Sequence, residues 1–464
     1  MRHPSLRRPT AAVAVAASLA LALAGCGGSD DDNKSSGTWP GARDSKCSGL
    51  DQLAQYGDLT GKTVHVQTSI TDAEGETQKA SYKLFTECTG AAVNYDANKD
   101  FEGNVLTNVQ AGNVPDIAYV DQPGLLTSLI NTGAVVEAPD DVEANVDKFW
   151  TDDWKNYGSV DGTFYAAPLG ANVKSFVWYS PKMFAQHGWT VPTTWDDMMS
   201  LSDKIAASGI KPWCAGFESG DATGWPGTDW IEEVLLRQAG PDVYDQWVSH
   251  EIPFNDPQIV KAFDTVGDIL KNPDYVNGGI GDVKSIAQTA FGDAGLPILD
   301  GKCAMHQMAS FYGGFFDPDG KKGVKVAEDG DVWAFYEPVM NDQFGKPIEG
   351  GGEFVAAFND DPATAAFQTY LSTDVWANEK AKSTPSGGWV TANNGLDPNN
   401  LVSPIDKLSA QILADPDTTF RFDASDSMPA AVGTGTFLKE MVNWVSGQST
   451  QDTVDAIEAS WPSS

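Results

Sequence analysis

Hydrophobic and polar residues alternate along the first part of the chain with the periods of strands and helices. Val64, Val66 and Ile70 stand between polar residues, which indicates a strand with one buried face. Beyond them, stretches with apolar side chains at helical spacing alternate with short apolar runs. This order predicts βαβ units on a parallel sheet, in an α/β fold whose ligands lie beyond the carboxyl ends of the strands. The predicted strands are 63–70, 92–95 and 116–120, and the predicted helices are 78–88 and 101–111.

The second part of the chain continues the mixture of strands and helices. Residues 173–179 predict another strand. Thr194 is suited to cap a helix, because Asp197 follows three positions later and apolar residues recur at helical spacing beyond it. Other helices are predicted to begin at acidic residues, which favour a helix N-terminus: Asp229, Asp256 and Asp361.

The N-terminus has the pattern of a secretory leader. Residues 11–24 are apolar apart from Ser18, and they follow a segment with three arginines and no acid. A helix of this length covers about 21 Å, which is short of the roughly 30 Å hydrocarbon core of a bilayer. We therefore expect residues 1–25 to be a signal peptide and not a permanent anchor.

The apolar run ends in Leu-Ala-Gly-Cys at 23–26, which resembles the lipobox of bacterial lipoproteins. In such proteins the cysteine becomes the first residue and carries a diacylglycerol, and an ordinary secretory cleavage site is the alternative. Lipidation of Cys26, with palmitate among the acyl chains, would hold the protein on the extracellular face of the cytoplasmic membrane. Residues 26–46 are predicted to form a flexible tether after this cysteine.

Four further cysteines remain, and thiols outside the cytoplasm oxidise. They allow three pairings. We expect Cys47 to pair with Cys88 and Cys214 with Cys303, because the other pairings would join early to late sequence and lock together parts that must open. The alternative is that one pair stays reduced and buried.

Length and charge limit the function classes. A chain of 464 residues exceeds what one hydrophobic core usually organises, which predicts two lobes. It carries 64 Asp and Glu against 30 Lys and Arg, a net charge of −34. This charge repels phosphate backbones and anionic lipids, so nucleic acid is excluded as a partner.

Motifs for phosphate, calcium and zinc chemistry are incomplete. Residues 57–63 are one residue short of a phosphate-binding loop, and they precede a strand instead of following one. Asp317 and Glu328 fit the register of a calcium loop, but Lys322 stands where glycine is needed. The histidines form no zinc or catalytic-triad motif. We therefore expect turns at these places, and neither a metal nor a cofactor.

Three loops together supply aromatic rings, carboxylates and a side-chain amide, at 121–124, 218–230 and 386–389. Sugars present C–H faces flanked by hydroxyls, so a carbohydrate site needs flat rings for stacking and side chains that accept hydrogen bonds from hydroxyls. The loops offer both. Core packing is the alternative for each single ring, and we expect it for these tryptophans: Trp195, Trp213, Trp247 and Trp444.

Several segments resemble the ABC transporter solute-binding proteins of family 1, the sugar-binding group, and within it the alpha-glucoside-type binding lipoproteins. The resemblance runs from about residue 60 to 460. Its markers are Gly-Asn-Val-Pro-Asp-Ile-Ala at 112–118, Asp-Gln-Pro-Gly at 121–124, Val-Pro-Thr-Thr-Trp-Asp-Asp at 191–197, Lys-Pro-Trp-Cys at 211–214 with Gly-Lys-Cys-Ala-Met at 301–305, and Gly-Gly-Gly-Glu-Phe at 350–354.

Members of this family have two α/β lobes joined by crossing hinge strands. This is the type II periplasmic-binding-protein fold, which closes on its ligand like a flytrap. The resemblance implies an N-terminal lobe of residues 47–168 and 349–388 and a C-terminal lobe of residues 169–348 and 389–464. The pairing of Cys214 with Cys303 matches a bridge of this subgroup.

The resemblance also implies a set of ligand-binding residues. In the first lobe they stand in and before the sugar-facing loop, in the crossing strands they flank the hinge, and in the second lobe they line the opposite wall, with a ring that would serve as a stacking platform. In that order they are Asp121, Gln122, Lys99 and Asp100; Asn172, Lys174, Ser175, Gly352 and Glu353; Glu218, Trp225 and Asp229; and Trp389. The first-strand loop, Ser-Ile-Thr-Asp-Ala-Glu at 69–74, departs from the family pattern of an aromatic or charged contact.

The function implied is that of a surface-anchored, monomeric binding component of an ABC importer. It would capture an uncharged mono- or oligosaccharide between its lobes and deliver it to permease subunits in the membrane, without chemistry of its own. One alternative is a surface-tethered glycoside hydrolase, with Asp121, Glu218, Asp229 or Glu353 as acid or nucleophile. A second alternative is an adhesin or envelope scaffold that binds no small ligand.

Overall fold

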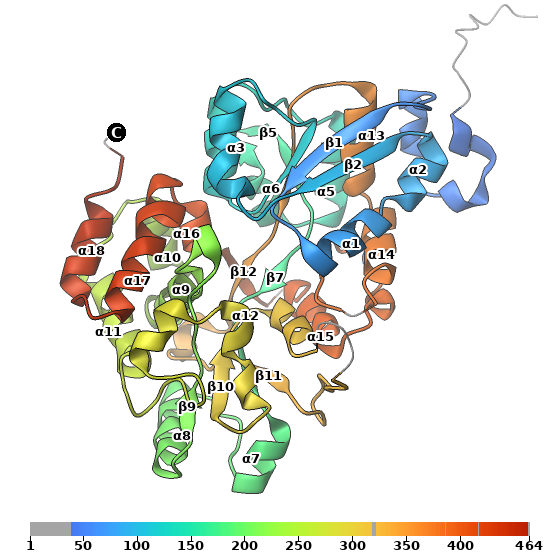
Figure 1. The fold of residues 1–464 in the computed structure, drawn as a ribbon. Helices are drawn as coiled ribbons and strands as arrows, with labels where there is room; N and C mark the ends of the chain where they lie inside the picture. The colour runs from blue at the N-terminus through green and yellow to red at the C-terminus, as the bar shows by residue number, and fades with distance from the viewer. Residues whose placement is uncertain (1–38, 318–321, 386, 416, 463–464) are drawn as a thin grey trace, which may run out of the picture. The chain divides into compact units, whose positions relative to one another are not determined.

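The computed structural model describes residues 39–317, 322–385, 387–415 and 417–462 and has the mixed α/β fold that the sequence predicts (Figure 1). The predicted signal peptide and Cys26 lie outside the described residues. Within them, no helix has both the length and the apolar character needed to cross a bilayer.

The strands of the described residues are short. They are β1 (Thr63–Thr68), β2 (Ala92–Ala97), β3 (Ile117–Val120), β4 (Ser159–Val160), β5 (Thr163–Phe164), β6 (Ala166–Pro168), β7 (Asn172–Val173), β8 (Phe176–Tyr179), β9 (Lys211–Trp213), β10 (Cys303–Gln307), β11 (Trp333–Tyr336), β12 (Pro347–Gly351), β13 (Phe354–Ala357) and β14 (Thr419–Phe422).

The α-helices cover the sheets formed by these strands. They are α1 (Asp72–Ala80), α2 (Lys83–Thr89), α3 (Phe101–Gln110), α4 (Pro123–Asn131), α5 (Asp140–Phe149), α6 (Asp152–Tyr157), α7 (Pro181–His187), α8 (Trp195–Ala207), α9 (Trp225–Ala239), α10 (Pro241–Val248), α11 (Pro257–Leu270), α12 (Phe291–Ala294), α13 (Pro362–Leu371), α14 (Asp374–Lys382), α15 (Pro404–Leu413), α16 (Ala424–Ser427), α17 (Leu438–Val445) and α18 (Thr450–Glu458).

A five-stranded sheet of order β2-β1-β3-β13-β6 organises what we call the first lobe. β1 pairs in parallel with β2 and β3, as the βαβ pattern predicts. β13 is antiparallel to both of its neighbours, so the sheet is mixed. In Figure 1 the orange helix α13 lies beside the blue strands β1 and β2, although it is far from them in sequence.

A four-stranded sheet of order β11-β8-β10-β9 organises the second lobe. Its core joins residues from β8 to β11 with residues from the C-terminal helices, and Figure 1 shows α17 and α18 beside α9 and α11. Trp213, Trp247 and Trp444 are fully buried there and Trp195 is nearly so, which confirms the prediction that these four rings are core residues.

A third, small sheet of order β14-β12-β7 lies where the chain passes between the lobes. β12 pairs in parallel with β14 and antiparallel with β7. The backbone of β12 runs on almost directly into β13 of the first lobe. We call these three strands the crossing sheet, and its members are the crossing strands that the fold class predicts.

Some predicted elements have different bounds. The helix at 78–88 is broken, because α1 ends at Ala80 and Ser81 donates its hydroxyl back to the carbonyl of Gln78. The strand at 173–179 is two strands, β7 and β8, which pair in different sheets. Asp229 does not begin a helix, because α9 already starts at Trp225 with a proline in its first turn. The other two helix starts stand as N-caps: Asp256 and Asp361.

The predicted cap at Thr194 is present, because its hydroxyl accepts the amide hydrogen of Asp197 at 3.2 Å. The prediction of a flexible tether up to residue 46 is wrong for residues 39–46. Trp39 is buried in the first-lobe core, and short 3₁₀ turns follow it at Pro40–Arg43 and Ser45–Cys47. The free energy released by burying the indole ring of Trp39 outweighs the conformational entropy that this segment loses, which explains the difference.

Both predicted cystines are formed. Cys47 and Cys88 have Cα atoms 5.8 Å apart, and Cys214 and Cys303 have Cα atoms 5.9 Å apart. Each cystine joins residues of a single core: the first ties the N-terminal segment to α2, and the second ties the segment after β9 to β10. Neither crosses the lobes.

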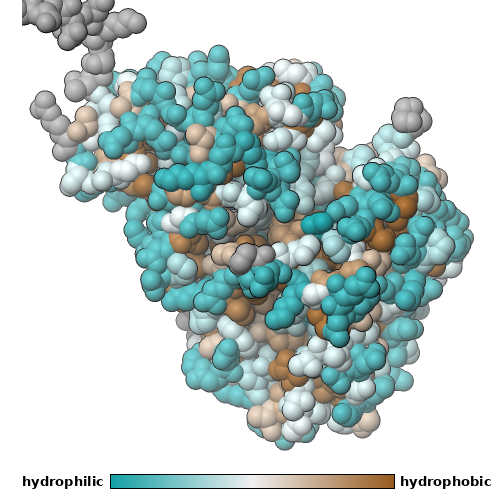
Figure 2. Space-filling view, turned by 180° about the vertical axis from the view of Figure 1, so that it is seen from behind, coloured by the Kyte–Doolittle hydropathy of each residue, from teal (hydrophilic) through white to brown (hydrophobic). Residues whose placement is uncertain are grey.

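The face of the molecule in Figure 2 is mostly hydrophilic, with apolar residues in small separate areas. Among the described residues the large apolar side chains with substantial exposure are few: Val114, Val191, Phe315 and Val402. One of these, Phe315, belongs to an aromatic group described below.

We predict that replacing both Cys47 and Cys88 by alanine lowers the free energy of unfolding by about 3 to 4 kcal/mol, because the cystine closes a long loop in the unfolded chain. Chemical denaturation of the oxidised wild type and the double variant measures this. A fully reduced wild type, which lacks both cystines, should lose more than the double variant, whereas no loss in the double variant would show that the N-terminal segment is held by packing alone.

Candidate functional site

The carboxyl ends of β1 and β3 place the first-lobe part of the predicted site. These parallel strands are neighbours, so the residues that follow them, Ser69 and Asp121, meet at one edge of the sheet. The Ser69 hydroxyl donates to Asp121 Oδ2 at 2.8 Å. The Gln122 amide donates to Glu102 Oε2 at 2.7 Å, which brings the first turn of α3 to the same place. The first-strand loop therefore contacts the predicted site through Ser69.

Glu353, directly before β13, joins this group. Its Oε2 accepts the amide hydrogen of Gly170 at 2.9 Å. Burial raises the pKa of Asp121 well above its ordinary value, and the negative charges of Glu102 and Glu353 raise it further. Burial likewise raises the pKa of Glu353 to about 7, with a contribution from Glu74. Hydrogen-bond donors from a ligand would therefore stabilise the ionised form of these buried carboxyl groups.

Trp389 lies close to Glu353 but shows little surface. The ring is 7% exposed, packs edge-on against Trp376 at 5.6 Å between centroids, and belongs to the first-lobe core. The residues before it are held by Asp406, whose Oδ2 accepts the amide hydrogen of Gly388 at 2.8 Å. Burial raises the pKa of Asp406 to about 7. The role of Trp389 as a stacking platform stays a prediction.

The second lobe contributes a group of aromatic rings around Trp225. Phe291 lies 5.1 Å from Trp225, and Phe311 lies 6.2 Å from it, between centroids. Phe315 completes the group, at 5.4 Å from Phe291 and 6.2 Å from Phe311. Trp225, Phe291 and Phe311 are partly exposed and Phe315 is exposed, so the group presents apolar ring surface to solvent. We call these four residues the aromatic group.

A backbone hydrogen bond to Phe291 places Glu218 beside the aromatic group. The Glu218 carbonyl accepts the amide hydrogen of Phe291 at 3.0 Å, and its own carboxylate accepts that of Gly220. A carboxylate next to exposed rings is the combination that the loop at 218–230 predicts.

The other predicted residues lie at the hinge or at the entry to α3. Asn172 accepts the amide hydrogen of Gly351 and so joins β7 to β12. Gly352 is needed because a Cβ there would come within 2.3 Å of the Gly170 carbonyl oxygen. Lys99 and Asp100 are exposed and stand directly before α3.

Lys174 is buried and held by two carboxylates. Its Nζ lies 2.9 Å from Asp229 Oδ1 of α9 and also contacts Asp423 Oδ2, directly after β14. It also lies 5.4 Å from the ring centroid of Trp225, a cation–π distance. Burial alone would raise the pKa of Asp423, but the Lys174 ammonium lowers it, so Asp423 stays ionised. Burial raises the pKa of Asp229 to about 7 despite the same ammonium.

Ser175 follows Lys174 and serves the backbone of the hinge. Its hydroxyl accepts the amide hydrogen of Glu349 at 3.0 Å, and its carbonyl accepts that of Glu337. Ser175 is fully buried, so its contacts are those of a structural residue of the crossing sheet.

Three carboxylates at this place, those of Asp229, Glu349 and Asp423, have oxygens within 4.8 Å of one another. Such a spacing could suit a cation, but the positive charge that the structure places here is the Lys174 ammonium. We therefore assign no metal to these residues.

The two lobes approach each other where α4 meets α16. A Cβ on Gly124 would lie 3.2 Å from the backbone carbonyl oxygen of Asp426 in α16. Burial raises the pKa of the Asp426 carboxyl group well above its ordinary value, and the negative charge of Asp423 raises it further. A Cβ on Gly124 of α4 would lie 2.0 Å from the Met428 carbonyl oxygen, so only glycine allows α4 to approach the segment after α16 this closely. Gln122, directly before α4, is therefore held near the second lobe.

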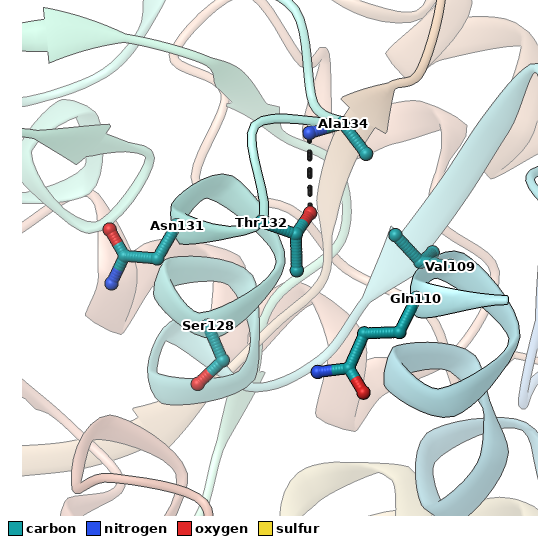
Figure 3. Close-up of a pocket in the computed structure, with 6 residues that line it drawn as sticks. All are labelled: Val109, Gln110, Ser128, Asn131, Thr132 and Ala134. Atoms are coloured by element: carbon teal, nitrogen blue, oxygen red, sulfur yellow. Dashed lines mark hydrogen bonds between the residues drawn. The ribbon is translucent and has the colours of Figure 1, made fainter. Parts of the chain in front are cut away.

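A separate hollow of about 560 Å³ lies between the C-terminal ends of α3 and α4 (Figure 3). Its lining has neither an aromatic nor a charged side chain, and the hydrogen bond drawn there joins the Ala134 amide to the Thr132 hydroxyl. No predicted ligand residue lines it. With neither a ring to stack on nor a carboxylate, it lacks the chemistry of the groups described above.

The profile of the bacterial extracellular solute-binding protein family matches residues 67–305. The chain is also 35% identical to the osmoprotective compounds-binding protein GgtB of Synechocystis, over 88% of this chain and 94% of that protein. It belongs to the bacterial extracellular solute-binding proteins.

A second relative, the alpha-glucosides-binding periplasmic protein AglE of Rhizobium meliloti, is 35% identical over 89% of this chain and 90% of its own. Among solved structures, a chitin oligosaccharide binding protein superimposes with a TM-score of 0.70 at 18% identity, covering 86% of this chain and 97% of that one. This likeness shows the two-lobed periplasmic-binding fold. The predicted family and fold class are thus confirmed, and the chain is a solute-binding protein whose relatives are extracellular or periplasmic.

Sequence reasoning missed several residues of the two groups. The predicted set lacks Phe291, Phe311 and Phe315, although Ser-Phe-Tyr-Gly-Gly-Phe-Phe at 310–316 combines rings with glycines, as the predicted loop at 386–389 does. Glu102 and Asp406 carry no local signal, because each is an ordinary acid in the first turn of a helix.

We predict that Lys174→Met lowers the free energy of unfolding at neutral pH by about 3 kcal/mol or more, because Asp229 and Asp423 would be left buried without their cation. In this variant both acids gain from protonation in the folded state, so stability should recover as the pH falls toward about 5.

Lys182→Met is the matched control. Its ammonium pairs with Asp331 at the surface, so its loss should change the free energy of unfolding by less than about 1 kcal/mol. Urea denaturation of both variants at two pH values makes the measurement. Equal small effects of the two substitutions would contradict the assigned importance of the buried pair.

Proposed function

We propose that this solute-binding protein captures a saccharide between its two lobes and delivers it intact to an ABC importer. The observation that carries the proposal is the exposed aromatic group beside Glu218, together with the carboxyl groups of Asp121 and Glu353 in the other lobe. Rings bind the C–H faces of a sugar, and carboxyl groups accept hydrogen bonds from its hydroxyls. Names of relatives such as the alpha-glucosides-binding protein support a sugar as the ligand.

The charge of the site favours an uncharged ligand. Asp121, Glu353 and Asp426 bring carboxyl groups to the facing surfaces, while the nearby Lys174 ammonium is already neutralised by two carboxylates. An anionic sugar would bring a negative charge next to buried carboxyl groups whose own ionisation is already disfavoured, which costs free energy. A neutral mono- or oligosaccharide supplies hydroxyl donors without that cost.

Closure of the lobes would allow the importer to distinguish the ligand-bound protein from the ligand-free protein. A ligand moves an open–closed equilibrium from 1:99 to 99:1 only if it binds the closed form better by about 5.5 kcal/mol. Stacking on aromatic rings contributes about 0.5 to 1.5 kcal/mol per pair, and hydrogen bonds to charged groups about 1.5 to 3 kcal/mol. A few contacts of each kind on both lobes are therefore sufficient to shift the protein to its closed form.

The proposal also covers how the protein is anchored in the cell and which partner it has. We propose that Cys26 carries lipid, that the protein is held on the extracellular face of the cytoplasmic membrane, and that it acts as a monomer that docks on permease subunits. The Leu-Ala-Gly-Cys sequence at 23–26 supports the anchor, and membership of the solute-binding family supports the permease partner.

We predict that Trp225→Ala weakens sugar binding by about tenfold or more, which corresponds to about 1.4 kcal/mol, and leaves the protein folded. The reason is the loss of the largest ring of the aromatic group. Isothermal titration calorimetry with the best sugar of a saccharide panel measures it.

Trp461→Ala is the control for this experiment, because Trp461 is also partly exposed but stacks on His250, away from the predicted site. It should leave sugar affinity unchanged. Equal affinity of the Trp225 variant and the wild type would remove the aromatic group from the site.

We also predict that the protein returns its ligand unchanged. A bound sugar at a concentration of about 100 times its Kd should stabilise the folded state by about 2.7 kcal/mol, which raises the melting temperature. Chromatography of the same sample should recover the sugar intact. Turnover would favour the glycoside hydrolase instead, and the absence of any melting shift across the panel would favour the scaffold.

A further inference from the structure

Each strand of the crossing sheet has a buried titratable residue within it or directly after it. Lys174 directly follows β7, Glu349 lies within β12, and Asp423 directly follows β14. The amide of Lys174 donates to the carbonyl of Glu349 at 2.9 Å, so the two side chains belong to neighbouring backbone segments. The packing of all three strands of the crossing sheet therefore depends on the charge state of the side chains in one small region.

Acids outnumber bases in this region, which we call the hinge cluster. It combines six carboxyl groups, none more than 1% exposed, with two cationic side chains that are nearly as buried. If all were ionised, the interior would hold an excess of negative charge without solvent. The members are Asp229, Glu232, Glu233, Glu337, Glu349 and Asp423, with Lys174 and Arg237.

Four of the six acids have partners that compensate a negative charge. Asp229 and Asp423 share the Lys174 ammonium, and Glu233 pairs with Arg237. Glu232 accepts backbone hydrogens at the start of α16, from Ala424 at 2.6 Å and Ser425 at 3.2 Å, and is also reached by the hydroxyl of Tyr244.

Glu349 has no such compensation. Both of its carboxyl oxygens are buried, and neither accepts a hydrogen bond from any residue that the structure describes. An ionised carboxylate without donors in a protein interior costs several kcal/mol, whereas a protonated carboxyl group is only a small polar group. The same holds for Glu337, which stands after β11 at the rim of the cluster.

We propose that Glu349 holds a proton at neutral pH and that the loss of this proton at alkaline pH loosens the crossing sheet, so that proton concentration regulates the hinge of this receptor. The middle strand of the crossing sheet would then carry a new negative charge close to Asp423, which is already ionised. Repulsion would act between β12, α9 and the segment after β14, which are the parts that the hinge joins.

The pKa shifts of the hinge cluster agree with a protonated Glu349. Burial raises the pKa of Glu349 well above its ordinary value, and nearby acids raise it further against the opposing effect of Lys174. Burial raises the pKa of Glu233 to about 8, although Arg237 lowers it. The titratable and charged groups that face Glu349 are Asp229, Glu232, Glu233 and Arg237 of α9, Tyr244 of α10, Lys174 after β7 and Asp423 after β14.

The sign of the pH dependence follows from linkage. An acid whose pKa is higher in the folded than in the unfolded chain binds more protons when folded. Its contribution to stability is therefore present at low pH and is lost as the pH rises toward the folded pKa. Surface acids are ionised in both states near neutrality, so they add little to this change.

The test compares Glu349→Gln with the wild type and with Glu251→Gln, an exposed acid of the same lobe. Glutamine mimics the protonated acid. Thermal unfolding of the ligand-free protein at about pH 4.5, near the unfolded pKa of a glutamate, should show equal melting temperatures for all three, within about 1 °C. At about pH 8.5 the Glu349 variant should melt roughly 3 °C or more above the other two. A variant that is less stable than the wild type at both pH values, or equal to it at both, would overturn the proposal.

A measurement on the wild type keeps the proposal testable if the variant does not fold. Difference infrared spectroscopy between about pH 6 and about pH 9 should show a C=O band of protonated carboxylic acids that disappears on raising the pH. Because Asp229 and Glu233 contribute to this band as well, the part that belongs to Glu349 is the decrease of the band in Glu349→Ala relative to the wild type. A spectrum with no such band at about pH 6, or an undiminished band in Glu349→Ala, would overturn the proposal.

The consequence for ligand binding rests on the proposed function. Between about pH 6 and pH 8.5, the affinity of the wild type for its sugar should fall by roughly threefold or more, and that of Glu349→Gln should fall less. If no sugar binds at either pH, the proposed function fails while the unfolding experiment on the ligand-free protein still decides the state of Glu349. Equal falls in affinity for both proteins would show that the hinge cluster does not regulate binding.

Discussion

The ammonium of Lys174 and the two carboxylates around it hold together the place on which the two-lobed arrangement depends. Lys174 follows the first crossing strand, Asp423 follows the last, and Asp229 comes from α9 of the second lobe. The three groups are buried, so each needs the others. The same ammonium lies over Trp225, and the hinge and the aromatic group therefore share a residue. A change in the charge of the cluster would reach the ligand side of the second lobe through a single side chain.

The two lobes contribute different chemistry to the proposed site. The first lobe brings carboxyl groups at the ends of parallel strands, where Asp121 meets Ser69 and Glu353 meets Gly170. The second lobe brings rings, with Trp225 at the start of α9, Phe291 at the start of α12, and Phe311 and Phe315 together on a third segment. Neither group by itself surrounds a sugar, because stacking leaves the hydroxyls in water and the carboxyl groups provide no apolar face. A ligand that satisfies both groups at once therefore favours closure.

The burial of so many acids is unusual for a chain that is already strongly acidic. Surface acids keep their solvation, but those of the hinge cluster must share cations, accept backbone hydrogens or hold protons. Asp423 and Glu232 take the first two routes, and Glu349 is left with the third. Stability and hinge motion thereby become linked to pH through residues that do not touch the ligand. The cystines, each within one lobe, leave such motion free.

Local sequence was sufficient for the elements whose cause is local. The alternation at 63–68, the short apolar run at 117–120, the cap at Thr194 and the burial of Trp213 follow from periodicity and side-chain chemistry. The family was recognisable from short motifs such as that at 112–118. Tertiary structure decided whatever depends on partners far away in sequence. Phe311 joins the aromatic group only because the sheets bring η7 (Ser310–Phe315) to the start of α9, and Lys174 becomes an ion-paired hinge residue only because Asp423 returns beside it. The physical reason is that burial and charge pairing are set by the sum of all neighbours, whereas periodicity records only those a few residues away.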